Sequence, residues 1–307
     1  MSTGATGDSA HGQGHGAGWA RDEAAALLLR ALVDDAAVYP PGNAPLGEAV
    51  AHHLTARSAW YAPVVGPLLV PASSVAALPG LLPPEVGPEA PLAVGIIADG
   101  GLEGLLAAHS DAASEPRLHV LHGEIAVRGD DVRGQVRSIL DAAEFPDLFV
   151  EIPLRDRAAA LAALDEVAAH ESGESVKLRT GGTAREAFPD EETVAWGLRC
   201  AIDRDLGVKL TAGLHHAVRH TDPATGFEHH GFLNALVAVR AALLGAEVED
   251  MARLLAERDP ARLLPHVHRM SEPDATVVRS FLRSFGCCGV TDPVADLVDL
   301  GLLRAST

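Results

Sequence analysis

The chain has 307 residues, a formal net charge of −18 and 48% hydrophobic residues, of which few are aromatic. This length suits one large domain with a sizeable core, and no apolar run reaches the roughly 18 residues of a membrane helix. Clustered Lys and Arg are needed to neutralise phosphates, so the acidic balance excludes a nucleic-acid surface, and we expect neither nucleic acid nor membrane as a partner.

The first 19 residues are rich in Gly, Ser and His and lack an apolar stretch. We therefore expect a disordered tail over 1–19 that is not a signal peptide, followed by one domain over 20–307. The three cysteines are Cys200, Cys287 and Cys288, which form neither a regular disulfide framework nor a CxxC pair. That usage is typical of a reducing, cytoplasmic location. We interpret Cys287 and Cys288 as packing residues at a strand end, where a thiol could also meet substrate.

From residue 20 onward, short apolar runs alternate with Ala- and Leu-rich helical patterns. This rhythm is typical of a parallel sheet covered on both faces, and eight strand signals favour a (β/α)8 TIM barrel over an open doubly wound sheet. The predicted strands are 31–39, 67–71, 92–98, 118–121, 148–152, 176–180, 208–212 and 280–287. The clearest predicted helices are 102–109, 131–143, 156–170, 191–205 and 231–244.

Two segments interrupt the rhythm. A helix is predicted over 46–62, with His52 and His53 on its surface. Residues 246–274 add a largely helical insertion before the last strand.

The chain contains only two lysines, Lys177 and Lys209, while 22 of its 24 cationic residues are Arg. They lie in near-copies of one phrase, since residues 176–182 read VKLRTGG and residues 208–214 read VKLTAGL. Arg stays charged, whereas a desolvated Lys can lose its proton and attack a carbonyl. The repeated context indicates a functional pair.

In such a barrel the site lies at the carboxyl ends of the strands, where alternate residues point inward. Lys177 and Lys209 would lie on adjacent strands, about 4.8 Å apart. Repulsion between them, with Arg179 nearby, would lower the pKa of one amine and make it a Schiff-base nucleophile.

The neighbouring strand ends supply further polar residues. Glu151 would either shuttle protons or form a buried salt bridge, and Arg179 would either clamp an anion or pair with Asp34 or Asp35. The predicted substrate-binding residues are Arg179, Thr180, Thr211, Asp34, Asp35 and Arg219.

The loop after the seventh strand concentrates histidines: His215, His216, His220, His229 and His230. His215 or His216 could act as a general acid or base. Alternatively, one histidine of each pair could join a carboxylate around a metal ion, which would make the chain a metal-dependent hydrolase or isomerase.

The paired lysine phrases resemble those of the deoxyribose-phosphate aldolase-like class I aldolase family, which folds as a TIM barrel. The segments LVDD at 32–35, FVE at 149–151 and FGCCG at 285–289 are similar to its first, fifth and eighth strands. The resemblance implies that Lys177 forms the imine and Lys209 tunes it.

Three features depart from that family, and one of them is that Leu178 and Arg179 replace the small polar residues after its first lysine. Its acidic residue on the fourth strand has no direct counterpart in residues 117–124, RLHVLHGE, where His119, His122 or Glu124 could substitute. Its phosphate loop is replaced by GLHH at 213–216.

The leading hypothesis is a Schiff-base lyase or aldolase that needs no organic cofactor and acts on a small anionic carbonyl compound. Lys177, Lys209, Glu151, His215 and His216 would be its catalytic residues. A barrel that binds an anionic metabolite without catalysis is a further alternative, and a homo-oligomer is compatible with the sequence.

Overall fold

The computed structural model describes residues 18–142, 144–170 and 175–305. The predicted tail, 1–19, lies outside them except for Gly18 and Trp19. Eight parallel strands form a closed barrel in the order β1-β10-β7-β6-β5-β4-β3-β2. The expected (β/α)8 barrel is therefore confirmed. Its strands are β1 (Val33–Asp35), β2 (Val65–Pro71), β3 (Leu92–Ile97), β4 (Leu118–Ala126), β5 (Leu148–Glu151), β6 (Ser175–Arg179), β7 (Val208–Thr211) and β10 (Leu282–Cys287).

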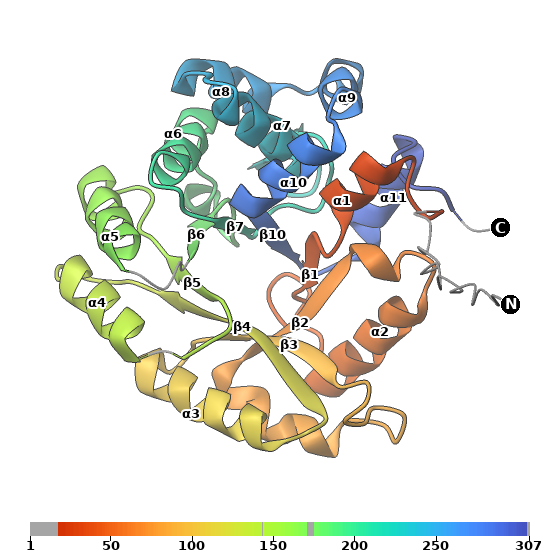
Figure 1. Cartoon of the computed structure of the whole chain (residues 1–307), viewed down its shortest axis with the longest axis vertical. Helices are drawn as coiled ribbons and strands as arrows, with labels where there is room; N and C mark the ends of the chain where they lie inside the picture. Colours follow the sequence, from red (N-terminus) through yellow and green to blue (C-terminus); the bar gives the residue numbers. More distant parts are fainter. Residues whose placement is uncertain (1–17, 143, 171–174, 306–307) are drawn as a thin grey trace, which may run out of the picture.

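Helices surround the strands as an outer ring (Figure 1). Aspartate side chains cap several of them, and α10 begins with a capping box made by Ser271 and Asp274. The helices are α1 (Glu23–Leu29), α2 (Leu46–Ser58), α3 (Gly101–Ser114), α4 (Val132–Ala142), α5 (Arg157–Ala169), α6 (Glu191–Ile202), α7 (Phe232–Leu243), α8 (Val248–Ala256), α9 (Pro260–His268), α10 (Glu272–Phe281) and α11 (Thr291–Asp299).

The predicted insertion, 246–274, contains α8, α9 and the first residues of α10, which continues to Phe281. Figure 1 shows α8 and α9 outside α7, on the far side from the barrel, while α10 packs beside α1. Short 3-10 helices complete the chain: η1 (Ala62–Val64), η2 (Ala72–Gly80) and η3 (Arg185–Ala187). None of the helices in the described ranges is long and apolar enough to span a membrane.

The main core lies between the strands and the helices. Strand residues that point outward, such as Val176, Leu178 and Leu210, are buried against the helix ring. The barrel interior is different, because it buries charged side chains from β1, β4, β6 and β7.

Most strand limits differ from the prediction by one or two residues, and the ends of β1 and β4 differ by more. β1 ends at Asp35, because the chain then turns and Tyr39 N–H donates to the Ala36 carbonyl. β4 continues to Ala126, five residues beyond the predicted end. Beyond the predicted end, His122 and Glu124 interrupt the apolar pattern but continue the strand, since they point into the barrel and find charged partners there.

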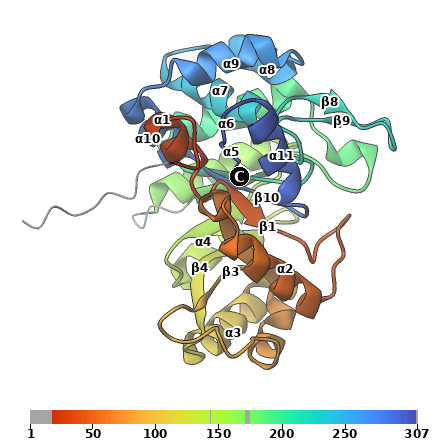
Figure 2. The same ribbon diagram turned by 90° about the vertical axis from the view of Figure 1, so that its right-hand side faces the viewer.

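The carboxyl ends of the strands carry the longest loops. In Figure 2 the loop after β1 and the hairpin of β8 (His220–Thr221) and β9 (Glu228–His229) project from the same end of the barrel. Both of these follow strands that contribute charged residues to the interior.

Candidate functional site

The two lysines lie side by side inside the barrel. Lys177 on β6 and Lys209 on β7 are direct register partners, and both side chains are buried. The strand alternation that aims them inward also sends Val176 and Val208 outward into the core. The predicted approach of the two lysines is therefore what the structure shows.

One carboxylate joins them. Glu124 on β4 is fully buried, with Oε2 2.8 Å from Lys177 Nζ and Oε1 2.7 Å from Lys209 Nζ. Burial alone would raise the pKa of Glu124, but the charges of Lys177 and Lys209 outweigh it and hold that pKa well below its ordinary value. Glu124 is thus an anion shared by two ammonium groups.

Lys209 is the more enclosed of the two amines. It forms an ion pair with Asp34 of β1, and its Nζ lies 5.3 Å from the centre of the Phe149 ring. Ser284 of β10 donates to Asp34 at 2.8 Å. Burial opposes the charged form of Lys209, but Asp34 and Glu124 overcome it and raise its pKa. Lys209 therefore stays charged beside Lys177, because carboxylates lie between and around the two amines.

His122 of β4 connects the same groups. Its Nε2 lies 3.0 Å from Glu124 Oε1 and 3.1 Å from Lys209 Nζ. Nε2 can donate to the carboxylate in one tautomer or accept from the lysine in the other. This position suits a group that passes a proton between them. Asp34, His122, Glu124, Glu151, Lys177 and Lys209 are called the lysine cluster below.

Lys177 is the member connected to the barrel mouth. Glu151 Oε2 lies 2.8 Å from Lys177 Nζ, and the same carboxylate accepts from Arg179 at 2.8 and 3.2 Å. Lys177 and Arg179 hold the pKa of Glu151 below its usual value against the opposing effect of burial. The Arg179 side chain is 47% exposed, so its outer face is open to an anion. Of the two predicted roles for Glu151, the structure shows the salt bridge, while Arg179 pairs with Glu151 and not with Asp34 or Asp35.

Tyr39, in the loop after β1, interacts electrostatically with Glu124 of this cluster. Its hydroxyl is buried and has no hydrogen-bond partner among the described residues. Burial, followed by the nearby charges of Glu124 and Asp99, raises the pKa of the phenol, which therefore stays protonated and keeps a donor available.

Two of the expected substrate-binding residues, Asp35 and Thr180, have other partners. Asp35 points out of the barrel to His53, whose Nδ1 lies 3.0 Å from its Oδ2. His53 is buried, so its predicted surface position is wrong: α2 covers β1 and places the imidazole against a carboxylate. The Thr180 hydroxyl donates to the carbonyls of Thr211 and Ala212 and braces the ends of β6 and β7.

Arg219 and the histidines occupy the loop between β7 and α7. Arg219 is buried and pairs with Glu191 at 2.8 Å, and its Nη1 lies 3.2 Å from His230 Nδ1. Burial lowers the pKa of His230 to about 4, so that ring is neutral. His216 is half exposed and lies 3.2 Å from Asp296.

The alternative of a metal site formed by the histidine-rich loop has no supporting set of ligands in the described residues. Among the residues that the structure describes, no three or more His, Cys, Asp or Glu side chains are arranged to hold a metal ion. His215 and His230 contact different partners, Asp292 and Arg219 respectively.

Sequence reasoning missed the central role of Glu124 and the parts played by His122, Ser284 and Tyr39. Glu124 had been one of three alternatives on the fourth strand, and of the other two His122 lies in the cluster whereas His119 is exposed. The available signal was alternation, because His122 and Glu124 are two residues apart and therefore share the inner face of β4.

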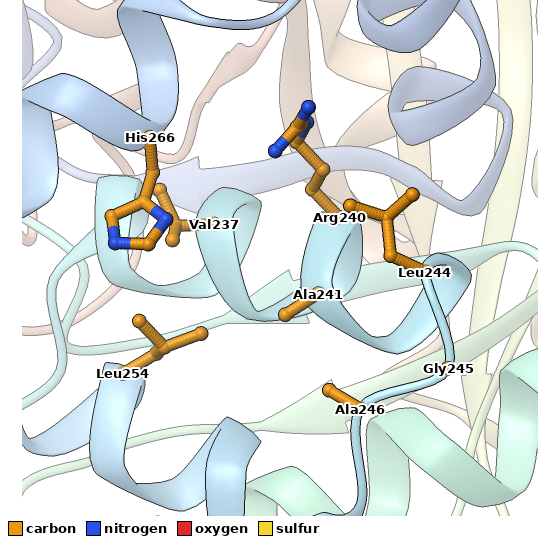
Figure 3. A pocket seen from close by; sticks show the side chains of 8 residues that line it. All are labelled: Val237, Arg240, Ala241, Leu244, Gly245, Ala246, Leu254 and His266. Atoms are coloured by element: carbon orange, nitrogen blue, oxygen red, sulfur yellow. The ribbon is translucent and has the colours of Figure 1, made fainter.

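A separate pocket lies away from this cluster. It has a volume of about 360 Å³ and is formed by the end of α7 together with α8 and α9 (Figure 3). Its only polar side chains are Arg240 and His266, and no member of the lysine cluster lines it. The barrel interior is the part with the greater capacity for chemistry.

No protein-family model and no curated protein matches the chain. Among solved structures, it is similar to a protein from Toxoplasma gondii ME49 assigned as a deoxyribose-phosphate aldolase. The two share 13% sequence identity over 91% of this chain and 94% of the other, with a TM-score of 0.41. The functional argument therefore depends on the site itself.

Proposed function

We propose that this protein is a Schiff-base lyase of the aldolase type, acting on a small anionic carbonyl compound. The observation that carries the proposal is the pair of buried lysines that share Glu124, with Lys177 alone connected through Glu151 to the exposed Arg179. Burying these charged side chains inside the barrel costs a large desolvation free energy. A catalytic role would explain why the protein buries them all the same.

Arg179 would bind the anionic group of the substrate. Its planar guanidinium matches a carboxylate or a phosphate, and its partner Glu151 is the outermost carboxylate of the cluster. Substrate binding would compete with Glu151 for Arg179 and bring the carbonyl group towards Lys177.

Lys177 must be neutral to attack. Its two carboxylate partners provide routes for the proton, and loss of the Lys177 charge removes one of the two cations that keep the pKa of Glu124 low. Glu124 would thereby become a better base at the step that needs one. The neutral amine would add to the carbonyl carbon, and loss of water would leave an imine between that carbon and Nζ.

Lys209 would remain charged throughout, held by Asp34 and Glu124. Its positive charge would favour deprotonation of its neighbour, and His122 would pass protons to and from Glu124. The free hydroxyl of Tyr39 would donate to the oxygen that carries charge as the carbon–carbon bond forms or breaks. His215 and His216 are not needed for this sequence of steps, because the cluster supplies its own proton carriers.

Reductive trapping tests this proposal. The protein would be incubated with a panel of small aldehydes and keto acids plus borohydride, and adducts would be mapped by mass spectrometry. We expect a reduced adduct on Lys177, absent from Lys177→Arg and retained, more slowly formed, in Lys209→Arg. Because the chain has only these two lysines, the only other amine that could react is the N-terminal one.

Trapping only at the N-terminal amine, or no adduct with any carbonyl compound, would contradict the proposal. Thermal stabilisation by a carbonyl metabolite without any adduct would instead favour a barrel that binds its ligand and does not convert it.

A further inference from the structure

A second polar cluster lies at the carboxyl end of β10. It consists of Cys287, Cys288, His215 and Asp292, and is called the thiol cluster here. Cys287 ends β10, Cys288 follows it, Asp292 belongs to the first turn of α11, and His215 comes from the loop after β7. All three cysteines of the chain are free thiols.

The two nitrogens of His215 have different partners. Nδ1 lies 3.0 Å from Asp292 Oδ2, and Nε2 lies 3.4 Å from Cys288 Sγ. Asp292 therefore fixes Nδ1 as a donor and leaves Nε2 to exchange a proton with the thiol. A carboxylate, an imidazole and a thiol in this order form the arrangement that activates a cysteine nucleophile.

The neighbouring thiol is placed differently. Cys287 is buried and its Sγ donates to the Gly289 carbonyl at 3.3 Å. Burial raises the pKa of the Cys287 thiol. It lies 3.7 Å from His215 Nδ1, the nitrogen that Asp292 already engages more closely. Cys288 is thus the thiol that His215 is placed to activate. The adjacent Cys287 serves as a thiol of low expected reactivity for comparison.

The histidine is suited to hold the proton. Contacts with Cys287 and Cys288, and more weakly with Asp292, raise the pKa of His215 to about 11 although burial opposes this. An imidazolium beside a thiol favours the thiolate, which is the nucleophilic form. The His215 side chain is 22% exposed and Cys288 is half-buried, so the pair can be reached from solvent.

The loop after β1 lies beside Cys288, since a Cβ added at Gly42 would be 3.0 Å from Cys288 Cβ.

We propose that Cys288 is a nucleophilic thiol, paired with His215 and oriented through Asp292, that adds to small α,β-unsaturated carbonyl compounds. The thiolate sulfur forms a bond to the β-carbon, and the electron pair of the carbon–carbon double bond moves to the α-carbon. That carbon takes the proton from His215 Nε2, which leaves the imidazole neutral. No oxidant or further reactant is needed. The inference does not rest on the lysine chemistry proposed above.

Acrylamide is a suitable probe, since it is small, uncharged and a conjugate acceptor. Modification of each cysteine would be followed by peptide mass spectrometry between pH 6 and 8, with Cys288→Ser and Cys287→Ser used to assign the adjacent thiols. We expect Cys288 to react about tenfold or more faster than Cys200 at pH 6.5. The rate at Cys200, whose pKa is raised by burial, should rise about tenfold per pH unit.

Variants show whether a fast reaction of Cys288 is due to activation by His215 or only to exposure of the thiol to solvent. His215→Asn should slow the reaction of Cys288 by about tenfold, and Asp292→Asn should slow it by a smaller factor. Cys287 reports on folding, because local unfolding would expose it and accelerate its modification. Lys177→Arg should leave the Cys288 rate unchanged.

Equal rates at Cys288 and Cys200, or a Cys288 rate that His215→Asn does not alter while Cys287 stays protected, would overturn the inference. Neither result would bear on imine formation at Lys177, so failure of one proposal is distinguishable from failure of the other.

Discussion

At the scale of single residues, Glu124 decides the electrostatics of the barrel interior. Two buried ammonium groups within hydrogen-bond reach of one carboxylate are stable only while that carboxylate is charged. Removing one partner of a buried ion pair leaves an uncompensated charge, and this is usually far more costly than losing a surface pair.

We therefore expect Glu124→Gln to lower the free energy of unfolding at pH 7 by about 3 kcal/mol or more. The measurement is urea unfolding followed by circular dichroism. Glu151→Gln is the matched control, because its carboxylate is partly exposed and pairs with Lys177 and the exposed Arg179. Similar losses of unfolding free energy in the two variants would contradict the prediction that Glu124 contributes more to stability than Glu151.

The native protein and Glu124→Gln should also differ in how their stability depends on pH. The pKa of Glu124 is lowered in the folded protein, so its stabilising contribution is present above its ordinary value of 4.5 and is lost as the pH falls through the folded value. The pKa of Lys209 is raised, so its contribution is complete below 10.5 and is lost only as the pH rises beyond that.

We expect the stability difference between the native protein and Glu124→Gln to be constant from about pH 5 to pH 9 and to shrink in stronger acid. Unfolding midpoints measured across this range check the expectation. A difference that grows on acidification would have the wrong sign for a carboxylate with a lowered pKa.

At the scale of elements, glycines on β2 and β3 provide the room that the polar interior needs. A Cβ added at Gly66 of β2 would fall on the Asp34 carboxylate, and one added at Gly95 of β3 would fall on the His122 ring. Neighbouring strands lie so close that an inward-pointing polar side chain on one strand needs a glycine beside it on the next strand.

Gly66→Ala should therefore displace Asp34 from Lys209 and destabilise the protein by about 2 kcal/mol. Gly104→Ala is the control, since nothing lies within 4 Å of its added Cβ and the residue is inside α3. That change should stabilise the protein by about 0.5–1 kcal/mol through helix propensity. Thermal unfolding of both variants tests the contrast, and a Gly66→Ala protein as stable as the native one would contradict it.

At the scale of the whole molecule, the net charge of −18 lies mainly on the surface, because the charges of the lysine cluster are balanced once Arg179 is included. Within that cluster and Arg179, three carboxylates face three cations. Salt screens exposed charges effectively and buried pairs much less.

We expect stability to increase when the ionic strength is raised from about 10 mM to about 300 mM, because surface self-repulsion weakens while the buried pairs persist. Unfolding midpoints measured in sodium chloride series provide the check. A midpoint that falls with salt would mean that exposed ion pairs outweigh the repulsion.

The strand and helix pattern was predictable because it depends on local periodicity. Runs such as 92–98 and 208–212 are apolar on the face that packs against helices, and each corresponds to a strand of the barrel. The fourth strand was cut short in the prediction at Leu121, because polar residues in a strand look like a loop unless their partners are known.

The lysine pair was also predictable, from its rarity and its repeated phrase, whereas its charge state was not. Sequence reasoning placed two cations together and expected mutual repulsion. The structure shows Glu124 between them, contributed by a strand 53 residues before Lys177. Asp34 reaches Lys209 from 175 residues away.

The sequence by itself determined the alternation of strands and helices, the barrel, and the inward direction of Lys177 and Lys209, since each follows from spacing within one segment. Only the tertiary structure decided which carboxylates meet which lysines, that His53 is buried, and that His215 faces Cys288 and not the lysines. The reason is that barrel closure brings together residues distant in the chain, and the pKa of a buried group depends on those neighbours more than on its own segment.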